Sequence, residues 1–345
     1  MVALFYRFLP PIGRFFFSSF LFVTADPKAK RYFKRIISRY DAQYVIAFLE
    51  KPLHINEYIC SNTEEANYRR WCLKKHLFLN PLNDLVLEHT CFAADVLQLP
   101  GIVTPIKEKD IPIYFGLFNQ IKQEFVYARY LCYQGQPFCD EPHYADKETC
   151  LVNLYDYPQY SIRIEQEKTA FRLLYSLFDK VAFFANKYWK LGIKDRDVTF
   201  HSIWKEESGY KHKCKHAAID AQNNESLLSI KWIYKDFNDR FGNSAHPELQ
   251  KFNMLRNALE HKYVKVHSGL QYSIKEPYFD TEGIYHISDD DLQKFTIELI
   301  CLVRELIIEL SMAVHIEELK RRQVYDKSEI ISQLTLQEYD DEWKF

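Results

Sequence analysis

The chain has 345 residues, of which 47% are hydrophobic and 27% are charged, and this composition excludes a disordered or fibrous protein. The formal net charge of -2 excludes attraction of nucleic acid by the molecule as a whole, so any such binding must rest on local basic patches. The 9 glycines are too few for an architecture of many tight turns, and long helices are favoured.

The 8 cysteines are scattered along the chain and include no Cys-x-x-Cys pair. This spacing argues against a zinc site and against a redox motif. Most of the cysteines have apolar neighbours, which is typical of buried, reduced thiols in the cytoplasm. We therefore expect a cytoplasmic protein that holds no metal and no other cofactor.

Residues 1–60 form an apolar and basic N-terminal segment. Residues 15–23 are apolar, but arginines and prolines interrupt the longer apolar stretch, so no stable membrane span is expected. A secretion signal, a membrane-surface anchor and a segment packed against the protein all fit this pattern, and we favour a packed or loosely attached segment. Basic and aromatic residues alternate over residues 28–39, which fits either a grip on nucleic acid or, as we prefer, a solvated helix face.

A helical extension is predicted over residues 61–160. Helices are expected at 62–79, 85–97 and 115–133, before an irregular stretch that ends the extension. The last of these helices has a polar side, which fits either a second polar wall near an active site or, more simply, a face turned to solvent. That side consists of Asn119, Gln123, Glu124 and Arg129.

Four longer helical patterns follow and predict an all-α fold, with an antiparallel four-helix bundle over residues 161–322 and a polar tail over 323–345. The fourth pattern has a strong start, because a serine can cap it and three aspartates lie in its first turn. The four helices are expected at about residues 165–191, 224–240, 247–266 and 288–322.

The loop between the first two bundle helices is basic, with Lys211, Lys213 and Lys215 interleaved with two histidines and a cysteine. The lysines would repel a cation and no fourth ligand is evident, so a metal site is disfavoured. Contact with an RNA backbone and a plain solvated linker are both open interpretations of this loop.

The third bundle helix contains Arg256, Asn257, His261 and Tyr263 within two helical turns, with Lys262 beside them. A helix advances about 100° per residue, so Asn257 and His261 share one face, while Arg256 and Tyr263 share another. Histidine can transfer protons near neutral pH, and the planar guanidinium of arginine donates paired hydrogen bonds to phosphate. These are groups that cleavage of RNA without a metal requires.

One helix supplies only one histidine, whereas the reaction needs a base for the 2′-hydroxyl and an acid for the leaving 5′-oxygen. A symmetric dimer would bring two arginines and two histidines around one cleft. A plainer interpretation is that Arg256 pairs with Glu260 one turn away and that His261 is an ordinary surface residue.

The pattern Arg256-Asn257-x-x-x-His261 in the third helix of a four-helix bundle resembles the HEPN superfamily of RNA-processing, toxin and defence proteins. Residues 71–84 and 119–124 also resemble a bacterial HEPN branch that is often found after TPR repeats. On that resemblance the similar region begins near residue 60. The chain departs from the branch in being too short upstream for a full TPR array.

The resemblance implies a metal-independent endoribonuclease that acts on RNA as a homodimer and leaves 2′,3′-cyclic phosphate and 5′-hydroxyl ends. Arg256 and His261 would be the catalytic pair, supported by Asn257. Some HEPN toxins carry a tyrosine two residues after the histidine, to which an antitoxin attaches AMP, and Tyr263 completes that pattern as a hypothetical target. Lys211, Lys213, Lys215 and Lys262 are our candidates for contact with RNA.

A toxin or anti-phage defence role therefore heads the functional hypotheses, with an antitoxin or a sensor protein as an expected partner. A non-catalytic module that binds RNA or a nucleotide through the same residues is the first alternative. An interaction scaffold built from the long helices is the second, and in that case substitution of Arg256 or His261 would change nothing.

Overall fold

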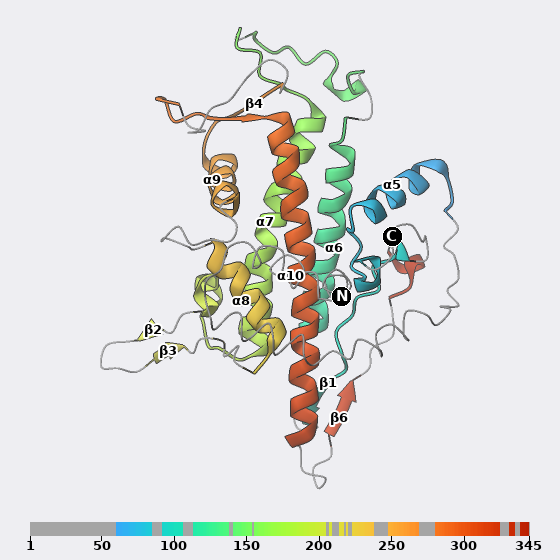
Figure 1. The fold of residues 1–345 in the computed structure, drawn as a ribbon, viewed down its shortest axis with the longest axis vertical. Coiled ribbons are helices and arrows are strands. Elements are labelled where there is room, and N and C mark those ends of the chain that lie inside the picture. The colour runs from blue at the N-terminus through green and yellow to red at the C-terminus, as the bar shows by residue number, and fades with distance from the viewer. Residues whose placement is uncertain are drawn as a thin grey trace, which may run out of the picture. The chain divides into compact units, whose positions relative to one another are not determined.

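The structure is a computed structural model of the chain, and it is mostly helical (Figure 1). Residues 1–59, nearly all of the predicted N-terminal segment, lie outside the residues that the structure describes. The described residues are 60–84, 92–105, 113–137, 141–153, 155–204, 207–208, 214–216, 219, 223–237, 248–268, 280–324, 331–334 and 339–344.

Six α-helices dominate the described part of the chain, and they confirm the all-α prediction. The strands are short and form three separate two-stranded pairs. None of the helices among the described residues is both long and apolar enough to cross a membrane. The helices are α5 (Thr63–Lys74), α6 (Ile113–Gln134), α7 (Ile162–Tyr188), α8 (Glu225–Phe237), α9 (Glu248–His261) and α10 (Asp289–Val324). The strands are β1 (Ile102–Pro105), β2 (Glu207–Ser208), β3 (Cys214–His216), β4 (Val264–His267), β5 (Tyr285–Ser288) and β6 (Ile331–Leu334).

Polar caps fix where several of the helices begin. Asn62 caps α5 by accepting from the backbone N–H of Glu65 at 2.9 Å. The Ser288 hydroxyl accepts from the N–H of Asp291 at 3.0 Å, as the sequence predicts for α10. Each cap satisfies a backbone donor that the first helical turn leaves without a partner.

Contacts group the chain into two compact units, each assembled from three separate stretches. The first unit comprises Met1–Val96, Phe125–Ser176 and Trp232–Glu305, and the second comprises Leu97–Glu124, Leu177–Lys231 and Leu306–Phe345. The predicted domain boundaries at residues 60, 160 and 322 do not coincide with the boundaries of these units, and they stay a prediction.

In the first unit, the end of α6 lies against the start of α7, and the start of α7 lies against the start of α10. Arg163 makes both contacts, because its guanidinium donates to the carbonyl of Gly135 at 3.3 Å and lies 3.6 Å from the carboxylate of Asp289. Helix α9 packs into the same core through Phe252, whose ring meets Phe171 and Phe295 at centroid distances of 5.9 and 5.4 Å.

In the second unit, the start of α6 lies against the end of α7, where the rings of Tyr114 and Tyr188 are 5.4 Å apart. The end of α7 in turn meets α10, because the Tyr188 hydroxyl donates to buried Glu318 at 2.5 Å. The end of α6 thus meets the start of α7 in the first unit, and the start of α6 meets the end of α7 in the second. The start of α8 is fixed here by Asn224, whose amide donates to the carbonyl of Ala313 at 2.9 Å.

Three predicted helices differ from the structure. The helix expected at 62–79 ends at Lys74. Residues 93–97 lie inside the helix expected at 85–97 but are irregular, because the Asp95 carboxylate is held by the N–H of Leu79 at 2.7 Å and by Arg129. The helix expected at 247–266 ends at His261, and Val264–His267 instead pair as strand β4 with β5. Arg256 and Tyr263 therefore do not share a helix face.

Candidate functional site

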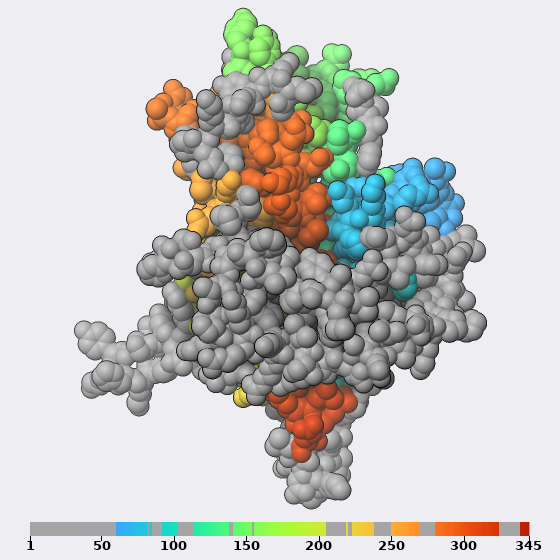
Figure 2. Space-filling model, in the orientation of Figure 1, coloured from blue at the N-terminus to red at the C-terminus, as the bar shows by residue number. Residues whose placement is uncertain are grey.

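Helix α9 has one buried side and one exposed side. Phe252, Leu255 and Ala258 recur at helical spacing and are buried, which holds the helix on the core of the first unit. Asn257 and His261, one turn apart, are exposed on the other side, as the sequence predicts. In the view of Figure 2, residues coloured for α9 reach the molecular surface.

Arg256 lies at the border between these two sides and is half-buried. Its guanidinium carbon is 5.6 Å from the centroid of the Tyr175 ring, and its Nη1 donates to the side-chain oxygen of Asn257 at 3.1 Å. The Asn257 amide nitrogen donates in turn to Asn253 at 3.3 Å. Asn257 therefore orients Arg256, while the aromatic face beneath it restricts the side chain further.

No carboxylate of the described residues forms an ion pair with Arg256 or with His261. The plainer interpretation, in which Arg256 pairs with Glu260, is thus not found, although both residues lie in the described part of the chain. The guanidinium keeps donors that no acceptor in the described part of the chain occupies, and the His261 ring is exposed. Both groups are available to an anionic ligand.

Tyr263 follows the helix rather than belonging to it. Its side chain is 42% exposed and its hydroxyl lies 2.5 Å from that of Tyr160, with the Lys265 ammonium 5.5 Å from its ring centroid. The hydrogen bond from Tyr263, followed by partial burial, raises the pKa of Tyr160 to about 12. Tyr263 thus packs against Tyr160.

A short ribbon continues from Tyr263 and joins the ends of three helices. The carbonyl of Tyr263 accepts from the N–H of Tyr285 at 3.0 Å, after which β4 and β5 pair in parallel. Residues before α7 border the other edge of β4, because Gln159 donates its N–H to the carbonyl of Val266 at 2.7 Å. Lys265 of β4 also forms an ion pair of 2.6 Å with Asp156.

Two histidines on this ribbon were missed by sequence reasoning. His267 of β4 is 1% exposed, and its Nε2 lies 3.0 Å from Nδ1 of His286 on β5. Nε2 of His286 lies 3.1 Å from the Asp280 carboxylate. No periodic pattern in the sequence points to them, because the two histidines are 19 residues apart and meet only through the pairing of β4 with β5.

The predicted RNA-contacting lysines divide into two groups. Lys262 is exposed directly after the helix that carries His261. Lys211 and Lys213, and the side chain of Lys215 within β3, lie outside the described residues. The only basic candidate that the described residues place beside the motif is therefore Lys262.

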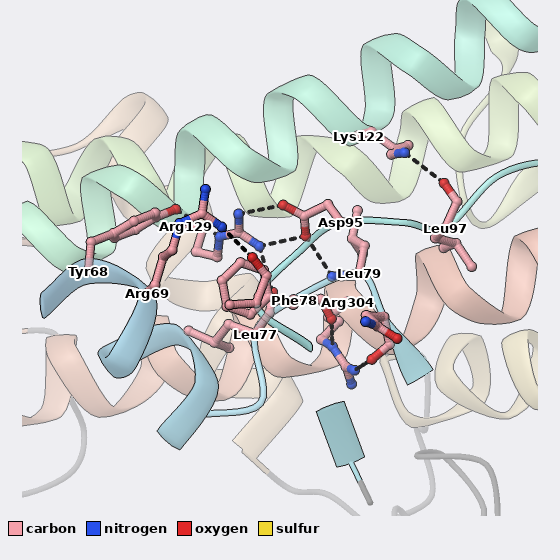
Figure 3. A network of polar contacts seen from close by, with 12 residues as sticks. Tyr68, Arg69, Leu77, Phe78, Leu79, Asp95, Leu97, Lys122, Arg129 and Arg304 are labelled. Atoms are coloured by element: carbon pink, nitrogen blue, oxygen red, sulfur yellow. Dashed lines mark hydrogen bonds and ion pairs between the residues drawn. The ribbon is translucent and has the colours of Figure 1, made fainter. Parts of the chain in front are cut away.

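The polar side of α6 is not wholly a solvent-facing surface. Asn119 and Gln123 are exposed, but Arg129 is buried, and Figure 3 shows it at the centre of a polar network. Its guanidinium donates to both carboxylate oxygens of Asp95 at 2.8 and 2.7 Å and to the carbonyl of Leu77 at 2.9 Å. Burial opposes the charge, but Asp95 outweighs it and raises the pKa of Arg129. The network holds the residues before α6 onto that helix.

Comparison with known proteins now bears on this geometry. The model of the LA2681-like HEPN family matches residues 105–317, more than half of the chain. The chain belongs to the LA2681-like HEPN family. No curated protein and no solved structure matches it. HEPN membership indicates a nuclease-related, RNA-related or defence role in general terms, and the matched region contains α6 to α9 together with the Arg256–His261 motif.

Proposed function

We propose that this HEPN protein is a metal-independent endoribonuclease that works as a homodimer, in the cytoplasm, as a toxin or anti-phage defence effector. One observation carries the proposal: His261 lies on the exposed side of α9 and Arg256 at the border of that side, and no carboxylate of the described residues neutralises either of them. A phosphate is the ligand for which an oriented, uncompensated arginine on the same helix as an exposed histidine is suited.

In the proposed reaction, the 2′-oxygen of RNA attacks the adjacent phosphorus while the bond from phosphorus to the 5′-oxygen breaks. His261 of one protomer accepts the proton of the 2′-hydroxyl, and the protonated His261 of the other protomer gives a proton to the leaving 5′-oxygen. Arg256 donates to the phosphate oxygens as negative charge gathers there, and Asn257 keeps its guanidinium in place. The products are a 2′,3′-cyclic phosphate and a 5′-hydroxyl.

The decisive experiment compares wild type with Arg256→Ala and His261→Ala on RNA in the presence of EDTA. Each substitution is expected to lower the cleavage rate by about 100-fold or more, because it removes a proton-transfer or charge-stabilising group. DNA of the same sequence should stay intact, since it lacks the 2′-hydroxyl. Glu260→Ala, an exposed neighbour on α9, is the matched control and should cleave RNA at close to the wild-type rate. Wild-type protein that cuts no RNA near neutral pH would contradict the proposal.

Tyr263 is a hypothetical site for attachment of AMP by an antitoxin. The observation behind this hypothesis is that its ring is 42% exposed and its hydroxyl contacts the hydroxyl of Tyr160, itself 43% exposed. The protein would be co-expressed with the products of the adjacent genes, and peptide mass spectrometry would then locate the modification. An unmodified Tyr263 in protein that is nevertheless silenced would rule this tyrosine out as the switch.

Binding of RNA without cleavage is the alternative function. The observation that favours it is the presence of a single exposed histidine on the described face of α9, which by itself supplies a base or an acid but not both. In that case Arg256→Ala would weaken RNA binding while wild type left the RNA whole.

A further inference from the structure

Three polar side chains on the ribbon after α9 form a continuous chain that the proposed reaction does not use. Asp280 accepts from the backbone N–H groups of Glu282 and Ile284, both at 2.9 Å, so its carboxylate is fixed before it meets His286. His286 then reaches His267, which is almost completely buried. The order is carboxylate, imidazole, imidazole.

The two imidazole rings lie edge to edge in nearly one plane. Their planes differ by 10° and their centroids are 5.2 Å apart, while the facing nitrogens are 3.0 Å apart. Face-to-face stacking would not bring ring nitrogens so close at that centroid distance, whereas a hydrogen bond within the plane does. His267 and His286 therefore share one hydrogen bond between Nε2 of the first and Nδ1 of the second.

This hydrogen bond sets a limit on the number of protons that the pair can hold. The Asp280 carboxylate can only accept, so Nε2 of His286 carries a proton. The facing nitrogens then need one proton between them, and the contact is satisfied whether the pair is neutral or carries a single positive charge. A second positive charge places N–H against N–H at a buried contact, and the bond is lost.

Charged or titratable groups of three described segments face His267. They are His286 on β5, Lys265 on β4 and Asp156 on the segment before α7. Asp280 contacts His286 on the side away from His267. Burial first, and the charge of His286 second, lower the pKa of His267, while Asp156 acts in the opposite sense. His267 is thus neutral at neutral pH, and the hydrogen bond is lost only in acid, when both rings carry a charge.

The histidine pair lies close to the end of α9. Only Lys262 and Tyr263 separate the end of α9 from the start of β4, and Pro158 bridges to His267. Strand β5 ends at Ser288, which caps α10. Separation of the two strands would release the segment that follows His261 from its neighbour β5.

We propose that His267 and His286, held by Asp280, are proton-responsive positioning residues that keep β4 and β5 together at neutral pH and release them in acid. The consequence for catalysis rests on the proposed function, because it assumes that His261 must be held in place to cleave RNA. The hydrogen-bonded group of Asp280, His286 and His267, called the clasp below, does not depend on that assumption.

Hydrogen–deuterium exchange of the full chain tests the clasp without an activity assay. Protection factors of the amides in β4 and β5 are compared at about pH 7.5 and about pH 5.5, after correction for intrinsic exchange. Uptake of one proton changes a local opening equilibrium by at most about tenfold per pH unit, so a loss of several-fold or more is expected in wild type. Unchanged protection of both strands in wild type would overturn the proposal.

His267→Gln keeps a side chain that can donate to His286 but cannot be charged, so its β4 and β5 protection should not change between the two pH values. His143→Gln is the matched control, because His143 is exposed and lies outside the pair, and it should respond as wild type does. Equal acid loss in His267→Gln and wild type would also overturn the proposal. If His267→Gln does not fold, Asp280→Asn provides the second variant: it removes the charge next to His286, and the pH at which protection is lost should differ from that of wild type.

Cleavage assays separate this proposal from the proposed function. If cleavage depends on Arg256 and His261 but exchange in β4 and β5 does not change with pH, the ribonuclease proposal is supported and the clasp proposal is contradicted. If β4 and β5 lose protection in acid but wild type never cuts RNA, the clasp proposal is supported and the ribonuclease proposal is contradicted.

Discussion

Glu167 on α7 is a carboxyl group enclosed in the core of the first unit. It is 1% exposed, its Oε2 has no hydrogen-bond partner among the described residues, and burial raises its pKa to about 8. The folded protein therefore keeps a proton on Glu167 that the unfolded chain gives up near its ordinary value of 4.5. Stability from this group is present in acid and is lost as pH rises through about 8. We expect Glu167→Gln to be more stable than wild type at about pH 9, by on the order of 1–3 kcal/mol, and to gain little at about pH 5. Urea unfolding at both pH values measures this, and a gain that did not grow with pH would contradict it.

The buried ion pair of Arg129 with Asp95 supports a second prediction. Asp95→Ala leaves a buried guanidinium without its counter-charge and should lower the free energy of unfolding by about 3–5 kcal/mol. Asp197→Ala, which removes an exposed partner of Arg196, is the control and should cost less than about 1 kcal/mol.

At the scale of elements, α9 depends on one aromatic anchor. Phe252 is 1% exposed between Phe171 and Phe295, so Phe252→Ala should destabilise the protein by about 3–5 kcal/mol and lower activity through loss of structure. Met254→Ala on the exposed side of the same helix should change the melting temperature little. An equal loss in both variants, measured by thermal unfolding, would mean that α9 is not anchored on this core.

The elements also separate what the sequence could predict from what it could not. Helices α7, α8 and α10 begin within a few residues of their predicted starts, because apolar spacing and caps are local signals. The end of α9 was predicted too late, since residues 264–267 are apolar enough to continue a helix and become a strand only through pairing with β5. Arg129 could not be predicted as buried because its partner Asp95 lies 34 residues away. The exposed positions of Asn257 and His261 followed from helical spacing alone, whereas the contact of Arg256 with Tyr175 required the tertiary fold.

At the scale of the whole molecule, the proposed chemistry requires two copies of the chain. Sedimentation equilibrium should give twice the chain mass of 41.3 kDa for wild type and for both alanine variants. If residues of two protomers share one cleft, mixing wild-type protein with an excess of His261→Ala protein should lower the activity toward that of the variant, since each mixed dimer holds one intact histidine and the reaction needs two. A monomer that cleaves RNA at full rate would contradict the shared cleft.

The interleaving of the two units in the sequence has a consequence for synthesis. Phe252 of α9 packs against Phe295 of α10, and the first unit takes residues as late as Glu305. A chain still on the ribosome cannot bury the apolar side of α9 until that late stretch has emerged. The surface that carries Arg256 and His261 is therefore completed only after residues up to Glu305 have emerged, and a product truncated before α10 would lack it.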